Sequence, residues 1–304
     1  MTLNLRGDKA FFSWRNKMVE AINGELERRF KDLKEDKPPD QVRLLTAMEY
    51  SVKSGGKRLR PLLTLSAALA TGGSEEDAMN AALAVELIHT YSLIHDDLPA
   101  LDNDSVRRGV PSSHIAFDEG TAILAGDALQ SLAFTILSEP QENISPAQLL
   151  LAINTLATAI GPLGMVGGQA LDLAYETKHP PLEDYSLMVE GKTACLIRVS
   201  LCLGSIVSEA EDGDLLNMYK IGQSAGMAFQ IVDDILNHEG DPKLMGKAVG
   251  TDASRGKASI LDHMDPHEAY GMAKKLILES ILLASVYICP QLEWSLLSLV
   301  DRLF

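Results

Sequence analysis

The fold is decided by residues 75–98, which read EEDAMNAALAVELIHTYSLIHDDL. Apolar side chains surround the middle of this stretch on almost every side, at Ala81-Ala82-Leu83-Ala84-Val85. A helix that is apolar all round is buried rather than laid on the surface. Pro99 follows directly and cannot continue a helix. The stretch therefore predicts one central helix, from about Glu75 to Leu98, that ends in an acidic pair, Asp96-Asp97.

Helical periodicity continues outward from this segment in both directions. Ala and Leu are abundant, aromatic residues make up only 5% of the chain, and no stretch alternates polar and apolar residues as a strand does. Breaks at glycine and proline predict further helices at residues 11–33, 40–52, 59–70, 119–138, 145–160, 162–176, 182–207, 213–236, 266–287 and 291–303. We predict an all-α protein in which residues 1–304 form a single bundle of about ten or more helices.

The charge balance and the cysteine pattern exclude several classes of protein. The formal net charge is -15, whereas a protein that binds nucleic acid needs a basic footprint for the phosphate backbone. The three cysteines form no Cys-x-x-Cys pair, which argues against a disulfide framework or a cysteine-based zinc site. The N-terminus lacks the apolar core of a signal peptide, and no run approaches the length of a membrane span. We expect a cytoplasmic protein without stable membrane insertion.

The acidic pair Asp96-Asp97 stands where negative charge is least favourable. A helix dipole repels anions at its C-terminus, and apolar flanks raise the cost of desolvating carboxylates. A solvated helix end would be the simplest explanation, but a second pair, Asp233-Asp234, ends another apolar run. Two such helices side by side would bring carboxylates together across one cavity, where Mg²⁺ would relieve their repulsion. Metal ions held in this way would bind a diphosphate.

Basic residues stand in short motifs that suit an anionic substrate. Gly55-Gly56-Lys57-Arg58-Leu59-Arg60 runs from a glycine turn into the start of a helix, where backbone N–H groups and cations can meet an anion. His89 lies about two turns before Asp96, on roughly the same helical face. Each cation alone would more often be a surface charge, but together with two acidic clusters they predict a diphosphate site. The other candidates are Arg107, Arg108, Lys192 with Thr193, Lys247 and Lys257.

In combination these motifs resemble the trans-isoprenyl diphosphate synthases, the polyprenyl synthetase family. His95 to Asp102 followed by Arg107-Arg108-Gly109 resembles the first aspartate-rich motif of that family, and Phe229 to Asp234 resembles the second. The basic motif at residues 55–61, the segment 167–173 and Gly191-Lys192-Thr193 also fit, and all stand in the family order. Within the family, the detailed form is most similar to the bacterial farnesyl diphosphate synthases.

The resemblance implies a helical bundle around a deep central cavity, usually in a homodimer, with three Mg²⁺ ions. The metal ligands that it implies are Asp96, Asp97, Asp102 and Asp233. The residues implied to bind isopentenyl diphosphate are Gly56, Lys57, Arg60, His89 and Arg108. Those implied to contact the allylic diphosphate are Arg107, Lys192, Thr193, Gln230, Lys247 and Lys257. Four of the latter would act in catalysis: Arg107, Lys192, Thr193 and Gln230.

An enzyme of this kind would condense isopentenyl diphosphate with dimethylallyl or geranyl diphosphate to make farnesyl diphosphate. Metal ions and basic side chains would stabilise the pyrophosphate that leaves, and the oxygens of Thr193 and Gln230 would face the allylic cation. No nucleophile is needed in such a pocket. The absence of a catalytic triad or of an obvious lone base in the sequence therefore agrees with this chemistry.

We predict that Tyr91, with Ser92 beside it, sets the length of the product. Tyr91 stands five residues before Asp96, about one and a half helical turns deeper. A ring at this depth would form the floor of the cavity and stop chain growth. In the family, an aromatic residue at this place goes with the fifteen-carbon farnesyl product. Geranyl and geranylgeranyl diphosphate are the alternative products.

The chain departs from the family in two places. The second acidic motif ends in Asn237 where aspartate is usual, so we expect weakened but not abolished metal binding. After Gly256-Lys257, the residues Ala258-Ser259-Ile260-Leu261 replace a Thr-Tyr-Pro-like segment. Because of this second difference, the resemblance does not predict the structure of the segment that follows Lys257.

Three other functions fit fewer of these residues. A metal-dependent phosphohydrolase could use His95-Asp96, but it would leave the second acidic pair unexplained. A terpene cyclase shares the ionisation chemistry, but it binds no second diphosphate and has no need of the basic motif. An inactive regulatory subunit of a prenyl synthase would suit Asn237, but not the retention of both acidic motifs.

Overall fold

The computed structural model describes residues 9–239 and 256–301, and nearly all the regular structure within them is helical. The longer helices are α1 (Lys9–Lys34), α2 (Pro39–Lys53), α3 (Leu59–Ala70), α4 (Met79–Asp96), α6 (Glu119–Leu137), α7 (Pro146–Ile160), α8 (Met165–Tyr175), α9 (Leu182–Val189), α10 (Cys195–Val207), α11 (Asp212–Glu239), α14 (Pro266–Ala284) and α15 (Pro290–Val300). Shorter elements include helix α5 (Ser113–Ala116) and a hairpin of β1 (Val106–Arg107) and β2 (Val110–Pro111). The predicted all-α fold is confirmed.

Three details of the predicted helices and strands are wrong, each for a local reason. Helix α4 begins at Met79 rather than Glu75, because the Ser74 hydroxyl accepts the Asp77 N–H at 3.1 Å and the chain turns before the helix starts. The prediction of no strands missed the β1–β2 hairpin, whose two-residue strands are too short to show alternation. The helix predicted over 182–207 contains a π-helical turn, Glu190–Ala194, between α9 and α10.

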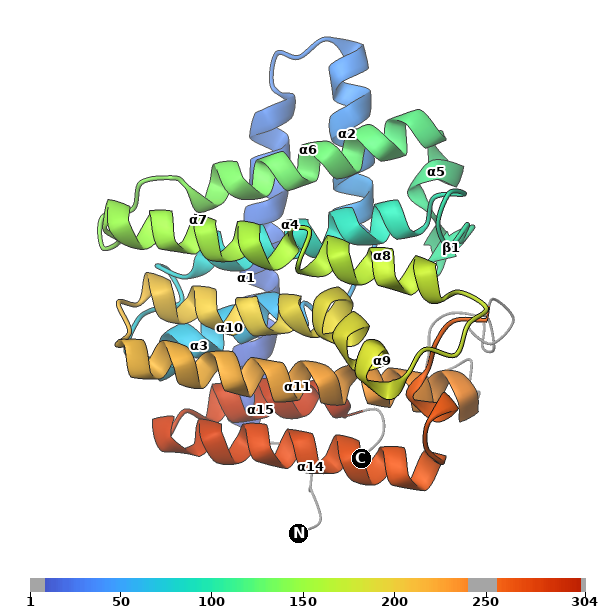
Figure 1. Ribbon diagram of the computed structural model, residues 1–304. Helices are drawn as coiled ribbons and strands as arrows, with labels where there is room; N and C mark the ends of the chain where they lie inside the picture. The colour runs from blue at the N-terminus through green and yellow to red at the C-terminus, as the bar shows by residue number, and fades with distance from the viewer. Residues whose placement is uncertain (1–8, 240–255, 302–304) are drawn as a thin grey trace.

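Helix α4 lies at the centre of the bundle. Its residues from Ala81 to Ile88 are all buried, as their apolar pattern predicts. The helix packs against α3, α6 and α10. Figure 1 shows α6 above α4 and the stack of α10, α11, α14 and α15 below it, with α1 and α2 standing upright behind them. The acidic C-terminal end of α4 is therefore held from several sides.

One arginine of the basic motif is structural. Arg58 has a left-handed backbone (φ 51°) just before α3, and its Nη1 lies 2.6 Å from Glu86 Oε1 of α4. Both side chains are almost fully buried, and Arg58 also donates to the Val52 carbonyl at 2.7 Å. Removing one partner of a buried ion pair leaves an uncompensated charge, which destabilises a fold strongly. This pair fixes the glycine turn of the basic motif against the central helix.

Two stretches are long and apolar enough to cross a membrane by length and composition, Glu119–Leu137 and Pro146–Tyr175. The prediction that no run approaches that length is therefore wrong. The second stretch holds two helices, α7 and α8, separated by the segment 161–164. Core helices pass the same criterion, and both stretches bury one face while exposing large apolar side chains on another.

Candidate active site

Two adjoining cavities gather most of the residues predicted from the sequence. The first measures about 600 Å³ and is lined from the C-terminal ends of α4 and α11, from α8 and α9, and from the segment 256–262. Its predicted members are Asp96, Asp102, Arg107, Lys192, Thr193, Gln230, Asp233 and Lys257. The second measures about 390 Å³ and shares Asp96, Lys192, Thr193 and Gln230 with the first. Beyond these it reaches four more predicted residues: Arg60, His89, Tyr91 and Ser92.

The π-helical turn carries Lys192 and Thr193 into the cavities. A π-helical turn inserts one extra residue into a helix and often marks a functional site. Helix α8 approaches this turn so closely that a Cβ on Gly168 would lie 2.0 Å from the backbone nitrogen of Lys192. The second glycine of the Gly167-Gly168 motif is therefore required for close packing, and this packing sets where Lys192 projects.

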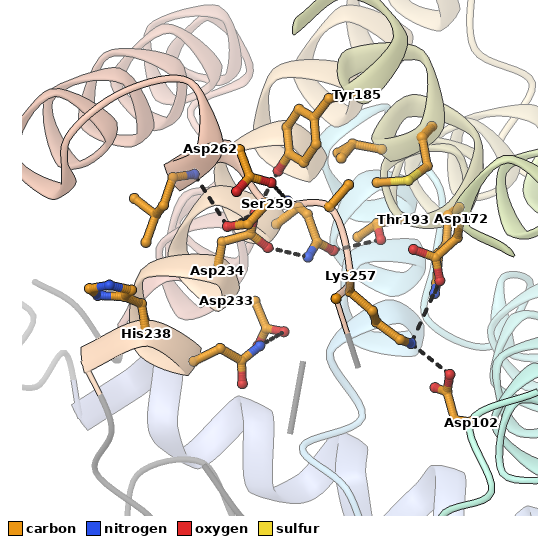
Figure 2. Close-up of a pocket in the computed structure, with 18 of the residues that line it drawn as sticks. Asp102, Asp172, Tyr185, Thr193, Asp233, Asp234, His238, Lys257, Ser259 and Asp262 are labelled. Atoms are coloured by element: carbon orange, nitrogen blue, oxygen red, sulfur yellow. Dashed lines mark hydrogen bonds and ion pairs between the residues drawn. The ribbon is translucent and has the colours of Figure 1, made fainter. Parts of the chain in front are cut away.

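Lysine–carboxylate pairs cross the first cavity. Lys192 Nζ lies 2.5 Å from Asp172 Oδ2, while Lys257 Nζ lies 2.6 Å from Asp102 Oδ1 and 3.6 Å from Asp172 Oδ2 (Figure 2). Asp172 is only 5% exposed, and we did not predict it as a site residue. The signal was present, because Asp172 is the one acid in the apolar, glycine-containing segment 167–173. These pairs hold both ammonium groups at the cavity wall.

Asp96 occupies a position where a carboxylate benefits from an added cation. Burial raises the pKa of Asp96 to about 6, and the nearby Lys192 only partly opposes this rise. Asp102 and Asp233 line the same cavity. Within residues 9–239 and 256–301, no group of three His, Cys, Asp or Glu side chains could hold a metal ion alone. Mg²⁺ often uses one or two carboxylates together with water and phosphate oxygens, so an open site of this kind fits it.

Asp97 lies elsewhere, contrary to the prediction that it helps to bind metal. It is 2% exposed, lines neither large cavity, and accepts a hydrogen bond from Arg107 Nε at 2.9 Å. Neighbouring residues on a helix point about 100° apart, and here Asp97 projects away from the cavities that Asp96 lines. Burial alone would lower the pKa of Arg107, but the hydrogen bond to Asp97 and the negative charges of Asp97, Asp104 and Asp96 together raise it. Asp97 therefore keeps Arg107 charged at the cavity wall.

Thr193 and Gln230 form a pair of dipoles where the two cavities meet. The Thr193 hydroxyl donates to Gln230 Oε1 at 2.7 Å, and Gln230 Nε2 donates to Asp234 Oδ1 at 2.8 Å. These bonds fix which end of the Gln230 amide faces Thr193. Both residues line both cavities, and the role of their carbonyl oxygens toward a carbocation stays a prediction.

Three basic side chains, Arg60, His89 and Arg108, form what we call the cation cluster. Arg60 Nη1 lies 3.3 Å from His89 Nε2, and a Cβ on Gly56 would lie 2.9 Å from Arg108 Cζ. Burial, together with Arg60 and Arg108, holds the pKa of His89 well below its usual value. Burial lowers the pKa of Arg60 to about 10 and also lowers that of Arg108. Each shift disfavours the positive charge, so the cluster would gain from a bound anion.

Two of the predicted lysines are not brought to the cavities. Lys57 is exposed and pairs with Asp301 at 3.0 Å, and it lines neither of the two large cavities. Lys247 lies outside the described residues. Within the basic motif, Arg60 therefore lines a cavity, whereas Lys57 does not.

Tyr91 lies at the wall of the second cavity and is 6% exposed. Burial raises its pKa to about 12, so the side chain is uncharged. His95 meets the Tyr91 ring edge to face, with 5.7 Å between the ring centroids. His95 is itself pressed against α6, since a Cβ on Gly126 would lie 2.1 Å from His95 Nε2. The Tyr91 ring is thus held at the cavity wall by a contact with His95, which lines the same cavity.

Asn237 lines the first cavity beside Asp233. Its Nδ2 makes a long hydrogen bond of 3.5 Å to Asp233 Oδ2. An aspartate in the same place would bring a second carboxylate to this distance, and the two would repel each other. Asn237 therefore orients Asp233 without adding negative charge.

The match to known proteins agrees with this geometry. Residues 41–281 match the family described as Polyprenyl synthetase. The chain belongs to this family. Among polyprenyl synthetases it is 45% identical to the farnesyl diphosphate synthase of Haemophilus influenzae over 240 residues, which cover 78% of this chain and 80% of that protein.

Two solved structures share the fold over almost the whole chain. An FPP/GFPP synthase from Zymomonas mobilis, solved as an apo structure, has a TM-score of 0.84 and 35% identity, and covers 95% of this chain and 99% of its own. A geranyltransferase from Helicobacter pylori, complexed with magnesium and isoprenyl diphosphate, has a TM-score of 0.83 and 32% identity, and covers 98% and 99%. Both support the predicted resemblance to this family of prenyltransferases.

Proposed function

We propose that this polyprenyl synthetase is a farnesyl diphosphate synthase. The observation that carries the proposal is that the two cavities adjoin. The first cavity is lined by the acids, and the second is lined by Arg60 and His89 of the cation cluster. An acidic site binds a diphosphate through metal ions, and a basic site binds one directly. Similarity to farnesyl diphosphate synthases supports the same activity.

In this proposal the allylic diphosphate binds in the first cavity. Asp96, Asp102 and Asp233 line it and would hold three Mg²⁺ ions, whose charge would stabilise the departing pyrophosphate. The magnesium complex of the Helicobacter pylori geranyltransferase supports the choice of metal. Lys192 and Lys257 would turn from their carboxylate partners toward the diphosphate oxygens, with Arg107 beside them. Isopentenyl diphosphate would bind the cation cluster through charge-assisted hydrogen bonds.

The reaction then follows from the placement of these groups. Cleavage of the allylic carbon–oxygen bond releases pyrophosphate and leaves a delocalised cation. The oxygens of Thr193 and Gln230 stabilise this cation, and the apolar wall of the second cavity keeps water away. The double bond of isopentenyl diphosphate forms the new carbon–carbon bond. Loss of a proton to the pyrophosphate then restores a double bond.

An elongation assay tests this function. The purified chain is incubated with isopentenyl diphosphate and either dimethylallyl or geranyl diphosphate, with Mg²⁺ or with excess EDTA. We expect farnesyl diphosphate with Mg²⁺ and no product with EDTA. Elongation that survives EDTA would overturn the metal mechanism. No elongation under any condition would favour the inactive regulatory subunit.

Tyr91→Ala is expected to lengthen the product. Removing a ring that is 6% exposed at the cavity wall opens a path beyond it, so chains of twenty carbons or more should appear. The loss of a buried aromatic side chain also costs about 3–5 kcal/mol of stability, so the assay should run well below the melting temperature. Chromatography of the dephosphorylated products measures the change.

Tyr91→Phe is the matched control for product length. It keeps the ring and removes only the hydroxyl, so we expect farnesyl diphosphate to remain the main product. If the alanine variant also made farnesyl diphosphate alone, Tyr91 would not be the floor.

We also propose that the protein is a homodimer that associates through the exposed apolar side chains of α6, α7, α8 and the segment 161–164 that joins the last two. We call these residues the apolar face: Ile123, Leu124, Leu150, Leu151, Leu163, Val166 and Leu173. Large exposed apolar surfaces mark interaction sites. Val166 and Leu173 also line the second cavity, so a partner subunit here would complete its outer wall. A second copy of the chain fits this surface, because a two-fold interface pairs one patch with itself.

Leu150→Asp is expected to convert the dimer into a monomer, since it would bury an unpaired charge in the interface. Leu150 is 68% exposed, so the change leaves the core intact. Leu282→Asp on α14, at a site 71% exposed, is the matched control and should leave the mass unchanged. Sedimentation equilibrium measures both masses. A wild-type protein that is monomeric at micromolar concentration would contradict the dimer, and binding to lipid vesicles would point to a membrane contact instead.

A further inference from the structure

Asp234 is a buried carboxylate that the proposed chemistry does not use directly. It is 8% exposed and accepts four hydrogen bonds from three parts of the chain. The donors are the Tyr185 hydroxyl at 2.8 Å, Gln230 Nε2 at 2.8 Å, the Ser259 hydroxyl at 3.1 Å and the Ile260 N–H at 2.8 Å. An ionised carboxylate offers roughly four lone-pair sites, and three of these donors bond to Oδ2 while Gln230 bonds to Oδ1, so protein groups satisfy most of the acceptor capacity of Asp234.

The donors connect Asp234 to the reacting groups on one side. Gln230 Nε2 points to Asp234, which turns Gln230 Oε1 toward the Thr193 hydroxyl at 2.7 Å (Figure 2). If the Gln230 amide rotated by half a turn, its NH₂ group would meet Thr193 and its oxygen would meet a carboxylate. Asp234 therefore decides the direction of the Thr193–Gln230 dipoles.

On the other side Asp234 holds the segment that carries Lys257. Ser259 and Ile260 follow Lys257 by two and three residues, and both donate to the same oxygen, Asp234 Oδ2. Lys257 Nζ then reaches Asp102 at 2.6 Å, across the first cavity. The position of this ammonium group depends on where the segment is attached, and Asp234 is an attachment point.

We propose that Asp234 is a positioning residue, which orients the Gln230–Thr193 dipoles and the Lys257 ammonium group together and binds no metal. The inference rests on the proposed function, because it assumes that these three side chains contact the allylic substrate. Preorganised dipoles accelerate a reaction because they need not rearrange as charge develops. Asp233 and Asp234 both line the first cavity, but Asp234 is taken up by protein donors, so Asp233 is the metal-ligand candidate of the pair.

Asp234→Asn tests the proposal against Asp233→Asn. The asparagine retains one acceptor oxygen and turns an NH₂ group toward donors, so we expect kcat to fall about a hundredfold. The Mg²⁺ concentration for half-maximal activity should stay within about twofold of wild type in Asp234→Asn, and rise at least about tenfold in Asp233→Asn. An equal rise in both variants would make Asp234 a metal ligand and overturn the proposal.

A double-mutant cycle with Lys257→Ala separates positioning from general damage. If Asp234 acts partly through Lys257, Asp234→Asn should cost less in the Lys257→Ala background than in wild type. A second cycle pairs Asp234→Asn with Gln230→Ala. If the losses of kcat from the single variants simply multiply in both double variants, the positioning role is contradicted. A wild-type protein that makes no prenyl product would defeat the proposed function itself, which is a separate outcome.

Milder variants cover the case in which Asp234→Asn does not fold. Ser259→Ala removes one donor and should lower kcat about three- to tenfold, while Ser259→Thr keeps the hydroxyl and should restore it. Tyr185→Phe removes a second donor with a similar effect. Full activity of both Ser259→Ala and Tyr185→Phe would show that the network does not position the reacting groups.

Discussion

Asp96→Asn is expected to lower kcat by about a thousandfold while the protein stays folded. Asp96 is the acid that lines both cavities, so it stands where the allylic diphosphate would ionise. Metal ions contribute several kcal/mol to stabilising a leaving group, and about 4 kcal/mol corresponds to a thousandfold change in rate. Asparagine keeps the shape of aspartate but offers no charge to the metal. Product formation at saturating substrates and Mg²⁺ measures the loss.

The stability of the same variant distinguishes a lost ligand from a damaged fold. Burial raises the pKa of Asp96 to about 6, which means that its charge is unfavourable in the metal-free protein. The melting temperature of metal-free Asp96→Asn should therefore equal or exceed that of wild type. Asp32→Asn on α1, an exposed site, makes the same chemical change and should alter neither kcat nor the melting temperature. A kcat within tenfold of wild type would remove Asp96 from the metal site.

The local pattern of the sequence predicted which two helices deliver carboxylates to the site, although α4 ends at Asp96 rather than Leu98 and α11 ends at Glu239 rather than Leu236. An apolar run with two acids near the end of the helix describes a buried helix that delivers carboxylates to a cavity, and α4 and α11 both do this. Such patterns depend on a few residues along one helix, which is why they can be read without a structure.

Helical geometry would have sharpened the interpretation of both acidic pairs. Adjacent residues project about 100° apart, so the two acids of each pair point in different directions. Asp96 and Asp233 line the first cavity, whereas Asp97 lines neither large cavity, and Asp234 lines the first cavity but is buried against protein donors. The two acids of each pair are thus not equal ligands, because the second one is occupied by hydrogen bonds from its neighbours.

Contacts between distant parts of the chain could not be predicted in this way. The partner of Asp234 on α9, Tyr185, is 49 residues away, and Lys257 meets Asp102 across 155 positions. Nothing in the local pattern around Lys57 indicates that it pairs with Asp301. The π-helical turn is equally hidden, because its residues have an ordinary helical pattern and its close contact with Gly168 of α8 depends on tertiary packing.

The second large effect is expected at the cation cluster. Arg60→Gln should raise the KM for isopentenyl diphosphate about a hundredfold and change the KM for the allylic diphosphate less than about threefold. Removing one partner of a desolvated charge pair costs about 2–5 kcal/mol, and each 1.4 kcal/mol is tenfold in affinity. Arg60 lines only the second cavity, which explains the expected selectivity between the two substrates. Initial rates with each substrate varied in turn measure the two constants.

Lys57→Gln is the comparison variant. The sequence motif predicts the same role for Lys57 and Arg60, but in the structure only Arg60 lines a cavity. Lys57 is exposed and already paired with Asp301, so its loss should raise the same KM less than about fivefold. Arg43→Gln on α2 breaks an exposed pair with Asp118 and a contact with the Phe117 ring, both outside the two large cavities, so it controls for the change in net charge and should leave both constants unaltered. If Lys57→Gln instead weakened isopentenyl diphosphate binding as much as Arg60→Gln, Lys57 would have to leave Asp301 and enter the cavity when substrate binds. An equal rise in both KM values for Arg60→Gln would mean that the cation cluster serves the two diphosphates together, rather than isopentenyl diphosphate alone.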